Sequence, residues 1–139
     1  MLKKVIICCC VATILALVFG VAVRPAHAIK PFSDEFKAKY VKEDSKEKKD
    51  QDFAELVTEA KCNVCHMGKS KKDRNPYGVE LAKLLDKKAD KADKDKIQSV
   101  LAKVEKLPVN PDEKKSPTFG DLIKAGKLPG GDPKQDKES

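Results

Sequence analysis

The pentapeptide Cys62-Asn63-Val64-Cys65-His66 constrains this chain more than any other feature. Residues i, i+3 and i+4 of a helical turn share one face, so Cys62, Cys65 and His66 are expected to point the same way. Two thiols and one imidazole at this spacing are the attachment signal for c-type haem. The thiols form thioethers with the two vinyl groups, and the imidazole Nε2 binds the iron. The sequence therefore predicts one covalent haem c with His66 as an axial iron ligand.

Three other uses of Cys62 and Cys65 compete with haem. An oxidising compartment would permit a structural disulfide. A thioredoxin-like redox pair is less suited, because no alternation of strands and helices surrounds the motif. A zinc site needs four ligands, whereas the chain after residue 28 offers two cysteines and one histidine. Haem is favoured over all three.

The first 28 residues have the pattern of an export signal. Two lysines precede an uncharged run at residues 5–23, which holds the other three cysteines. Small residues at Ala26 and Ala28 form a cleavage site before Ile29. An uncleaved membrane anchor is the alternative, because the run approaches the length of a membrane span. In both cases the chain from Ile29 onward is expected in the periplasm or otherwise exported, where bacterial c-type haem is attached.

Composition sets the size of the domain and its expected partners. Removing residues 1–28 leaves 111 residues, which is typical of one domain. The net charge falls from +7 to +4, because three basic residues and no acidic one are removed. The remaining lysines are interleaved with acidic residues, as on a solvated surface. Nucleic acid is not an expected partner, since no aromatic residues are interspersed among the basic ones. A mildly basic face for an acidic redox partner protein is expected instead.

The spacing of apolar residues predicts an all-α chain of four to six short helices. One helix signal, at residues 53–64, runs directly into the haem motif, and the clearest amphipathic pattern spans residues 97–107. Shorter helices are expected at residues 79–85 and 118–126, with a proline-containing loop at 108–117. The domain plan that follows is a signal peptide at 1–28, an N-terminal helix and charged linker at 29–52, a haem-binding domain at 53–128 and a flexible tail at 129–139.

Phe32, Phe36 and Tyr40 recur every four residues and form a narrow apolar stripe. The stripe predicts either a core face or a dimer interface, and core is favoured because small domains need their aromatic residues. Apolar residues are few for a chain of this size. A covalent haem is therefore expected to complete the core, and the haem-free chain is expected to fold poorly.

The order of these features resembles the class I cytochrome c family. A helix at residues 53–60 leads into the haem motif, and a lysine-rich loop then reaches Asn75-Pro76-Tyr77-Gly78 and another helix. The resemblance implies a bundle of short helices around one haem. It also implies that a proline carbonyl accepts a hydrogen bond from Nδ1 of the axial histidine, and Pro76 is the matching residue. A simple helix start at Pro76 is the equal alternative.

A second, looser resemblance covers residues 53–130. The haem motif, Tyr77-Gly78 and the ending from Thr118 to Pro129 are similar to a group of small secreted monohaem cytochromes. That group includes low-potential, dimeric and gas-binding members from anaerobic ammonium oxidisers, and some of them bind iron through an additional cysteine. The chain after residue 28 has no spare cysteine, so this ligand is not carried over. A dimer stays open as an alternative.

The second axial ligand of the iron cannot be assigned from the sequence. Class I electron carriers usually supply a methionine, but the only methionine after the export signal is Met67, which follows His66 directly and is tethered to the proximal side. Three arrangements stay open: a five-coordinate iron, a lysine amine that has lost its proton, and a ligand from a partner chain or from the amine of Ile29. Tyr40 and Tyr77 also offer oxygen atoms, although packing is favoured for both.

These observations predict a periplasmic electron carrier and not an enzyme, by analogy with other proteins that carry this site. The loss of a methionine ligand is expected to lower the reduction potential. The alternative is a haem protein whose open or labile distal site binds a small gas such as NO or CO. A peroxidase ranks third, because the chain after residue 28 has no distal histidine for acid–base work.

Overall fold

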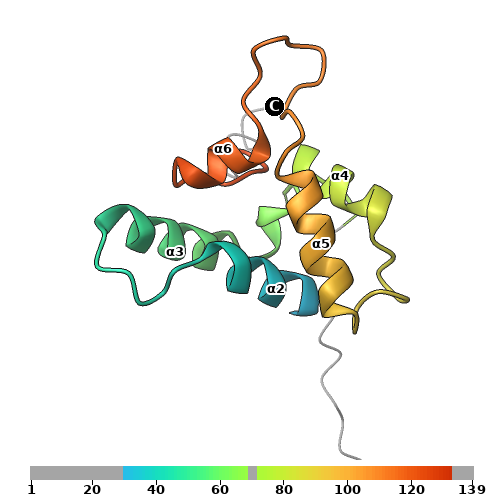
Figure 1. The fold of residues 1–139 in the computed structure, drawn as a ribbon, viewed down its shortest axis with the longest axis horizontal. Helices are drawn as coiled ribbons and strands as arrows, with labels where there is room; N and C mark the ends of the chain where they lie inside the picture. Colours follow the sequence, from blue (N-terminus) through green and yellow to red (C-terminus); the bar gives the residue numbers. More distant parts are fainter. Residues whose placement is uncertain (1–29, 69–71, 133–139) are drawn as a thin grey trace, which may run out of the picture.

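The computed structural model describes residues 30–68 and 72–132, which form helices joined by loops, with no β-strand in these ranges (Figure 1). The elements, in chain order, are α2 (Lys30–Tyr40), α3 (Lys48–Ala60), the short 3-10 helix η1 (Lys61–Val64), α4 (Pro76–Leu84), α5 (Lys94–Val104) and α6 (Phe119–Lys124). The prediction of an all-α chain is confirmed. None of these helices is long and apolar enough to cross a membrane. The expected signal peptide lies outside the described residues.

Short polar side chains fix the starts of three helices. Asn75, Asp93 and Thr118 each accept a hydrogen bond from the backbone N–H three residues later. Thr118 also forms a capping box with Asp121. Pro76 suits the first position of α4 because a proline has no backbone N–H to leave unsatisfied. Helix α4 therefore begins before residue 79, where the apolar pattern alone places its start.

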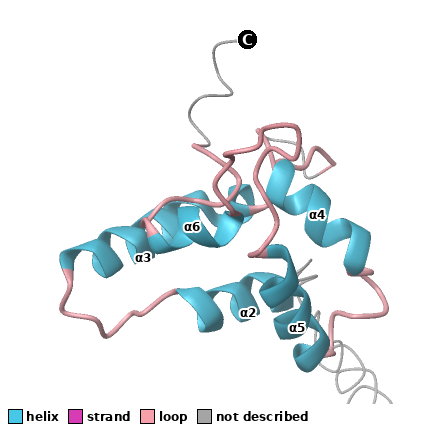
Figure 2. Cartoon of the chain, turned by 45° about the horizontal axis from the view of Figure 1, so that its top comes forward, coloured by secondary structure: helices cyan, strands magenta, loops and turns pink. Residues whose placement is uncertain are grey.

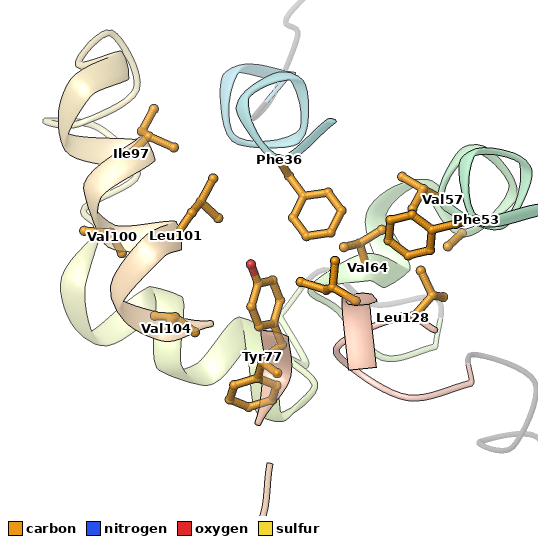
Figure 3. Packing of buried hydrophobic residues seen from close by; sticks show 13 residues of the cluster. Phe36, Phe53, Val57, Val64, Tyr77, Ile97, Val100, Leu101, Val104 and Leu128 are labelled. Carbon is orange, nitrogen blue, oxygen red and sulfur yellow. The ribbon is translucent and has the colours of Figure 1, made fainter. Parts of the chain in front are cut away.

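One apolar cluster joins all of the described helices (Figure 3). The ring of Tyr77, from α4, is completely buried and meets Phe36 and Phe119 edge to face, with centroid distances of 6.0 and 5.3 Å. Such edge-to-face pairs stabilise a core beyond the area that they bury. The buried members of the cluster are Phe36, Phe53, Val57, Ala60, Val64, Tyr77, Ile97, Val100, Leu101, Val104, Phe119, Ile123 and Leu128.

Helix α2 belongs to this core. Phe36 is buried, and Phe32 and Tyr40 pack against the cluster, so the aromatic stripe faces the core as favoured above. Helices α2 and α5 lie side by side (Figures 1 and 2). The Tyr40 hydroxyl lies 3.1 Å from the Leu101 carbonyl and 2.7 Å from Glu105 Oε2, both on this neighbouring segment. The expected N-terminal segment and the segment that is expected to bind haem thus form one packed unit.

The packed chain ends later than the predicted boundary at residue 128. Pro129 is fully buried directly after Leu128. A Cβ atom built on Gly130 would lie 1.8 Å from Asn75 Nδ2, so the backbone of Gly130 is pressed against that side chain. Pro129 and Gly130 therefore pack with the domain and not in the expected tail at 129–139, whose residues 133–139 lie outside the described residues. The composition suggested a tail, but a buried proline and a close backbone contact hold these residues in the fold.

Replacing Phe36 with alanine should lower the free energy of unfolding by about 3 kcal/mol, because it removes a buried aromatic ring between α2 and the rest of the core. Urea unfolding followed by circular dichroism measures this change. Lys39→Ala, at an exposed position of the same helix, is the matched control and should change the stability little. Equal effects of the two substitutions would show that α2 does not belong to the core.

Candidate functional site

Helix α3 leads directly into the haem motif through an unusual backbone conformation at Lys61. Lys61 has φ 50° and ψ −113° and is the only non-glycine residue with positive φ in the described ranges. A side chain with a Cβ is disfavoured in this region, at a cost of about 1–3 kcal/mol. The sharp change of direction ends α3 and starts the turn that carries Cys62.

The backbone of the motif forms a single turn. The N–H groups of Cys65 and His66 both donate to the Cys62 carbonyl, at 3.2 and 3.0 Å. Cys62 is exposed, Cys65 and His66 are half-buried, and the two cysteines are not joined by a disulfide. The structure thus brings the three residues expected to bind haem together on one turn with both thiols free.

The two cysteines lie in different surroundings. Cys65 packs against the apolar cluster, whereas Cys62 lies at the surface. Burial raises the pKa of the Cys65 thiol to about 12, and the neighbouring Cys62 adds to the rise. Since the thiolate is the reactive form, Cys65 in the folded chain is a poor nucleophile at neutral pH.

The imidazole of His66 is oriented by a backbone carbonyl. Its Nδ1 lies 3.2 Å from the Asp73 carbonyl, which also accepts the N–H of Met67 at 3.0 Å. His66 and Arg74 form an isolated antiparallel bridge, so the chain returns past the histidine here. In the tautomer that donates from Nδ1 to Asp73, Nε2 keeps a free lone pair. This is the arrangement of a metal-binding histidine.

Pro76 opens α4, as one of the two alternatives from the sequence predicts. The carbonyl that contacts His66 belongs to Asp73, three residues earlier. The role of Pro76 beside a haem-bound histidine stays a prediction. No sequence pattern points to Asp73, because a backbone carbonyl acts here and its residue type is not informative.

Asn75 is the site residue that sequence reasoning missed. It is 3% exposed, and its side-chain Nδ2 donates to the carbonyls of Asn63 and Val64, both at 3.1 Å. Its backbone N–H donates to the Cys65 carbonyl at 3.3 Å. The only signal in the sequence is a short polar residue before a proline, which predicts a helix cap and not a link to residues 63–65.

Two glycines let the segments around Asn75 come close together. A Cβ on Gly78 would lie 1.9 Å from the Cys65 carbonyl oxygen, so α4 and the haem motif meet backbone to backbone. Gly130 packs against the other side of Asn75. No side chain fits at either glycine without moving the turn or the cap.

The Tyr77 hydroxyl is buried without a hydrogen-bond partner among the described residues. It points toward Phe36 and Leu101, inside the cluster against which Cys65 packs (Figure 3). Burial, and then the nearby Tyr40, Cys65 and Glu105, raise its pKa well above the usual range, so it stays a neutral phenol. Burial first, and then the hydrogen bond to Glu105, raise the pKa of Tyr40 in the same direction.

The donor set fits a c-type haem. Two free thiols and an imidazole with an available Nε2 share one turn, and an orphaned hydroxyl lies in the adjoining apolar cluster. In haem the porphyrin holds the iron, so a single imidazole is sufficient from the protein. In the ranges 30–68 and 72–132, no three His, Cys, Asp or Glu side chains gather as a metal site of their own.

Comparisons of the chain with protein families, with curated proteins and with solved structures give no match.

In the haem-free, reduced chain, under conditions where circular dichroism shows its helices to be formed, iodoacetamide should alkylate Cys62 at least about tenfold faster than Cys65. The reason is that Cys65 is buried and its pKa is raised. The Cys65 rate should increase with pH toward 12, as its thiolate fraction grows. Peptide mass spectrometry measures both rates, and unfolding in urea should make them similar. Equal rates in the folded chain would contradict the buried position of Cys65.

Lys61→Gly should raise the free energy of unfolding by about 1 kcal/mol, since glycine adopts a positive φ without the Cβ strain. Lys61→Ala is the matched control, because it removes the long side chain but keeps the Cβ. Thermal unfolding of the two variants should show stabilisation by glycine alone. If Lys61→Ala stabilises the chain as much as Lys61→Gly does, the strain comes from the long lysine side chain and not from the positive φ.

Proposed function

We propose that this chain is an exported monohaem cytochrome, similar to class I cytochromes c, that transfers electrons. Its haem is bound covalently by Cys62 and Cys65, and His66 is an axial iron ligand. The observation that carries this proposal is the single turn that presents both thiols and His66, with Nδ1 of the histidine held by the Asp73 carbonyl.

Each group of the protein has a separate role in this proposal. When bound, haem supplies a one-electron iron couple. The Asp73 carbonyl fixes the tautomer and the ring direction of His66 and makes Nε2 a better donor. A thioether at Cys65 would form beside the apolar cluster, and a thioether at Cys62 would form at the surface.

A basic rim beside the histidine supports an acidic redox partner. An open hollow of about 440 Å³ lies next to the loop that carries Asp73. Lys72, Arg74 and Lys83 contribute cationic groups to it, and Lys83 also pairs with Glu80. Asp73 contributes one carboxylate, and Val79 and Ala82 contribute apolar surface. A mixed basic and apolar face of this kind steers an acidic protein and then holds it.

Gas binding is the second candidate function. After the export signal the sequence contains no histidine besides His66, and its only methionine, Met67, adjoins that histidine and is exposed. A strong distal ligand is therefore not evident. A distal site without one admits NO or CO to the iron, whereas a lysine or a partner ligand there favours electron transfer.

The absorption spectrum of exported, matured protein tests both functions. Covalent haem should survive extraction with acidic organic solvent and give a c-type pyridine haemochrome. The Cys62→Ala/Cys65→Ala double variant should lose it, and His66→Ala should keep haem but lose its axial field. Adding CO to the reduced protein separates the functions: immediate binding supports the gas ligand, and a low-spin spectrum unchanged by CO supports electron transfer. Absence of covalent haem in the native chain would exclude both.

A further inference from the structure

Every backbone carbonyl between Cys62 and His66 accepts a hydrogen bond from a single residue on another segment. The carbonyls of Asn63 and Val64 accept from the Asn75 side chain, and the Cys65 carbonyl accepts from the Asn75 backbone N–H. We propose that Asn75 is the positioning residue of the motif, which sets the direction in which Cys65 and His66 face the haem. The part that concerns haem rests on the proposed function.

The hydrogen-bonding capacity of the Asn75 amide matches this arrangement. An amide nitrogen has two hydrogens, and here it has two carbonyl acceptors at equal distances of 3.1 Å. The amide oxygen accepts the Gly78 N–H at 2.9 Å and thereby caps α4. One buried side chain thus joins the start of α4 to the turn that bears the haem ligands.

The surroundings leave Asn75 little freedom to adopt another arrangement. Gly130 lies against its amide, and Gly78 lies against the Cys65 carbonyl, both closer than any Cβ would permit. The bonds to residues 63 and 64 are shielded from water, because the side chain is 3% exposed. Buried hydrogen bonds between closely packed partners restrict the orientation of the turn more than exposed bonds would.

The same segment also contacts the histidine ring. Asp73, two residues before Asn75, provides the carbonyl at Nδ1 of His66. Residues 73–75 therefore contact His66 in two ways. The Asp73 carbonyl contacts its ring, and the Asn75 N–H donates to the carbonyl of Cys65, the residue before it. If the hydrogen bonds from Asn75 to the turn are lost, His66 keeps its partner at Nδ1, but the peptide group before its ring can rotate.

Asn75→Asp removes the two donors and keeps the oxygen that caps α4, with almost no change in shape. It also directs a carboxylate at two carbonyl oxygens, so the turn should be pushed away from α4. Asn110→Asp is the matched control, because Asn110 is exposed and its Oδ1 accepts the Asp112 N–H, which an aspartate also permits. Asn75→Ser is the second variant, since serine keeps a cap but cannot reach both carbonyls.

The test uses matured protein carrying haem. In Asn75→Asp and Asn75→Ser, the electron paramagnetic resonance spectrum of the ferric haem, which reports the direction of the axial imidazole, and the midpoint potential should both shift relative to the native chain. Neither should shift in Asn110→Asp. Measurements well below the unfolding temperature separate this effect from lost stability. An unchanged spectrum and potential in both Asn75 variants would overturn the proposal, even if their stability fell.

A second readout, independent of the proposed function, uses the haem-free chain under conditions where circular dichroism shows its helices to be formed. Both Asn75 variants should increase the alkylation rate of Cys65 about tenfold over the native rate, because the turn opens locally while the helices remain. The Cys62 rate should not change. If the native protein carries no haem but Cys65 responds in this way, Asn75 still positions the motif and only the proposed function fails. If Cys65 does not respond, the positioning role itself is wrong.

Discussion

The fold depends on a contact between two backbones, in which the carbonyl of Cys65 lies against the α-carbon of Gly78. Only glycine permits this approach, because a Cβ at residue 78 would lie 1.9 Å from the carbonyl oxygen. The contact fixes the first turn of α4 against the haem motif, and Tyr77 precedes the glycine in that turn. The position of the largest buried side chain in the core thus follows from the same contact that places Cys65.

Tyr77 therefore connects the candidate site to the core. Its ring pairs with Phe36 from α2 on one side and Phe119 from α6 on the other, so it joins the two ends of the described chain. Its hydroxyl has no hydrogen-bond partner within residues 30–68 and 72–132, and an unpaired hydroxyl costs about 1–3 kcal/mol in a protein interior. The aromatic contacts and the burial of the ring offset that cost. The core around Cys65 is thus well packed but keeps one unsatisfied polar group.

Local spacing predicted the parts of this structure that depend on local interactions. The period of the apolar residues revealed α5 and the second half of α3, and the motif placed Cys62, Cys65 and His66 on one turn. The first turn of α3 was missed because its charged residues carry no apolar period. Asp73 was missed because its backbone carbonyl, and not its side chain, contacts Nδ1 of His66. Asn75 was missed because its side chain binds backbone carbonyls on another segment. Such contacts leave no pattern of residue types, so only the folded chain reveals them.

The unequal surroundings of the two cysteines bear on how a covalent haem would serve this chain. A group attached to both sulfurs spans the boundary between the apolar cluster at Cys65 and the surface at Cys62. A haem edge at the surface would shorten the path for an electron, and an apolar environment at Cys65 would help to set its potential. Gas binding depends instead on the face of the iron opposite His66. If haem is bound as proposed, the exposed position of Cys62 would suit electron transfer, and the ligand on that opposite face would determine whether gas binding competes with it.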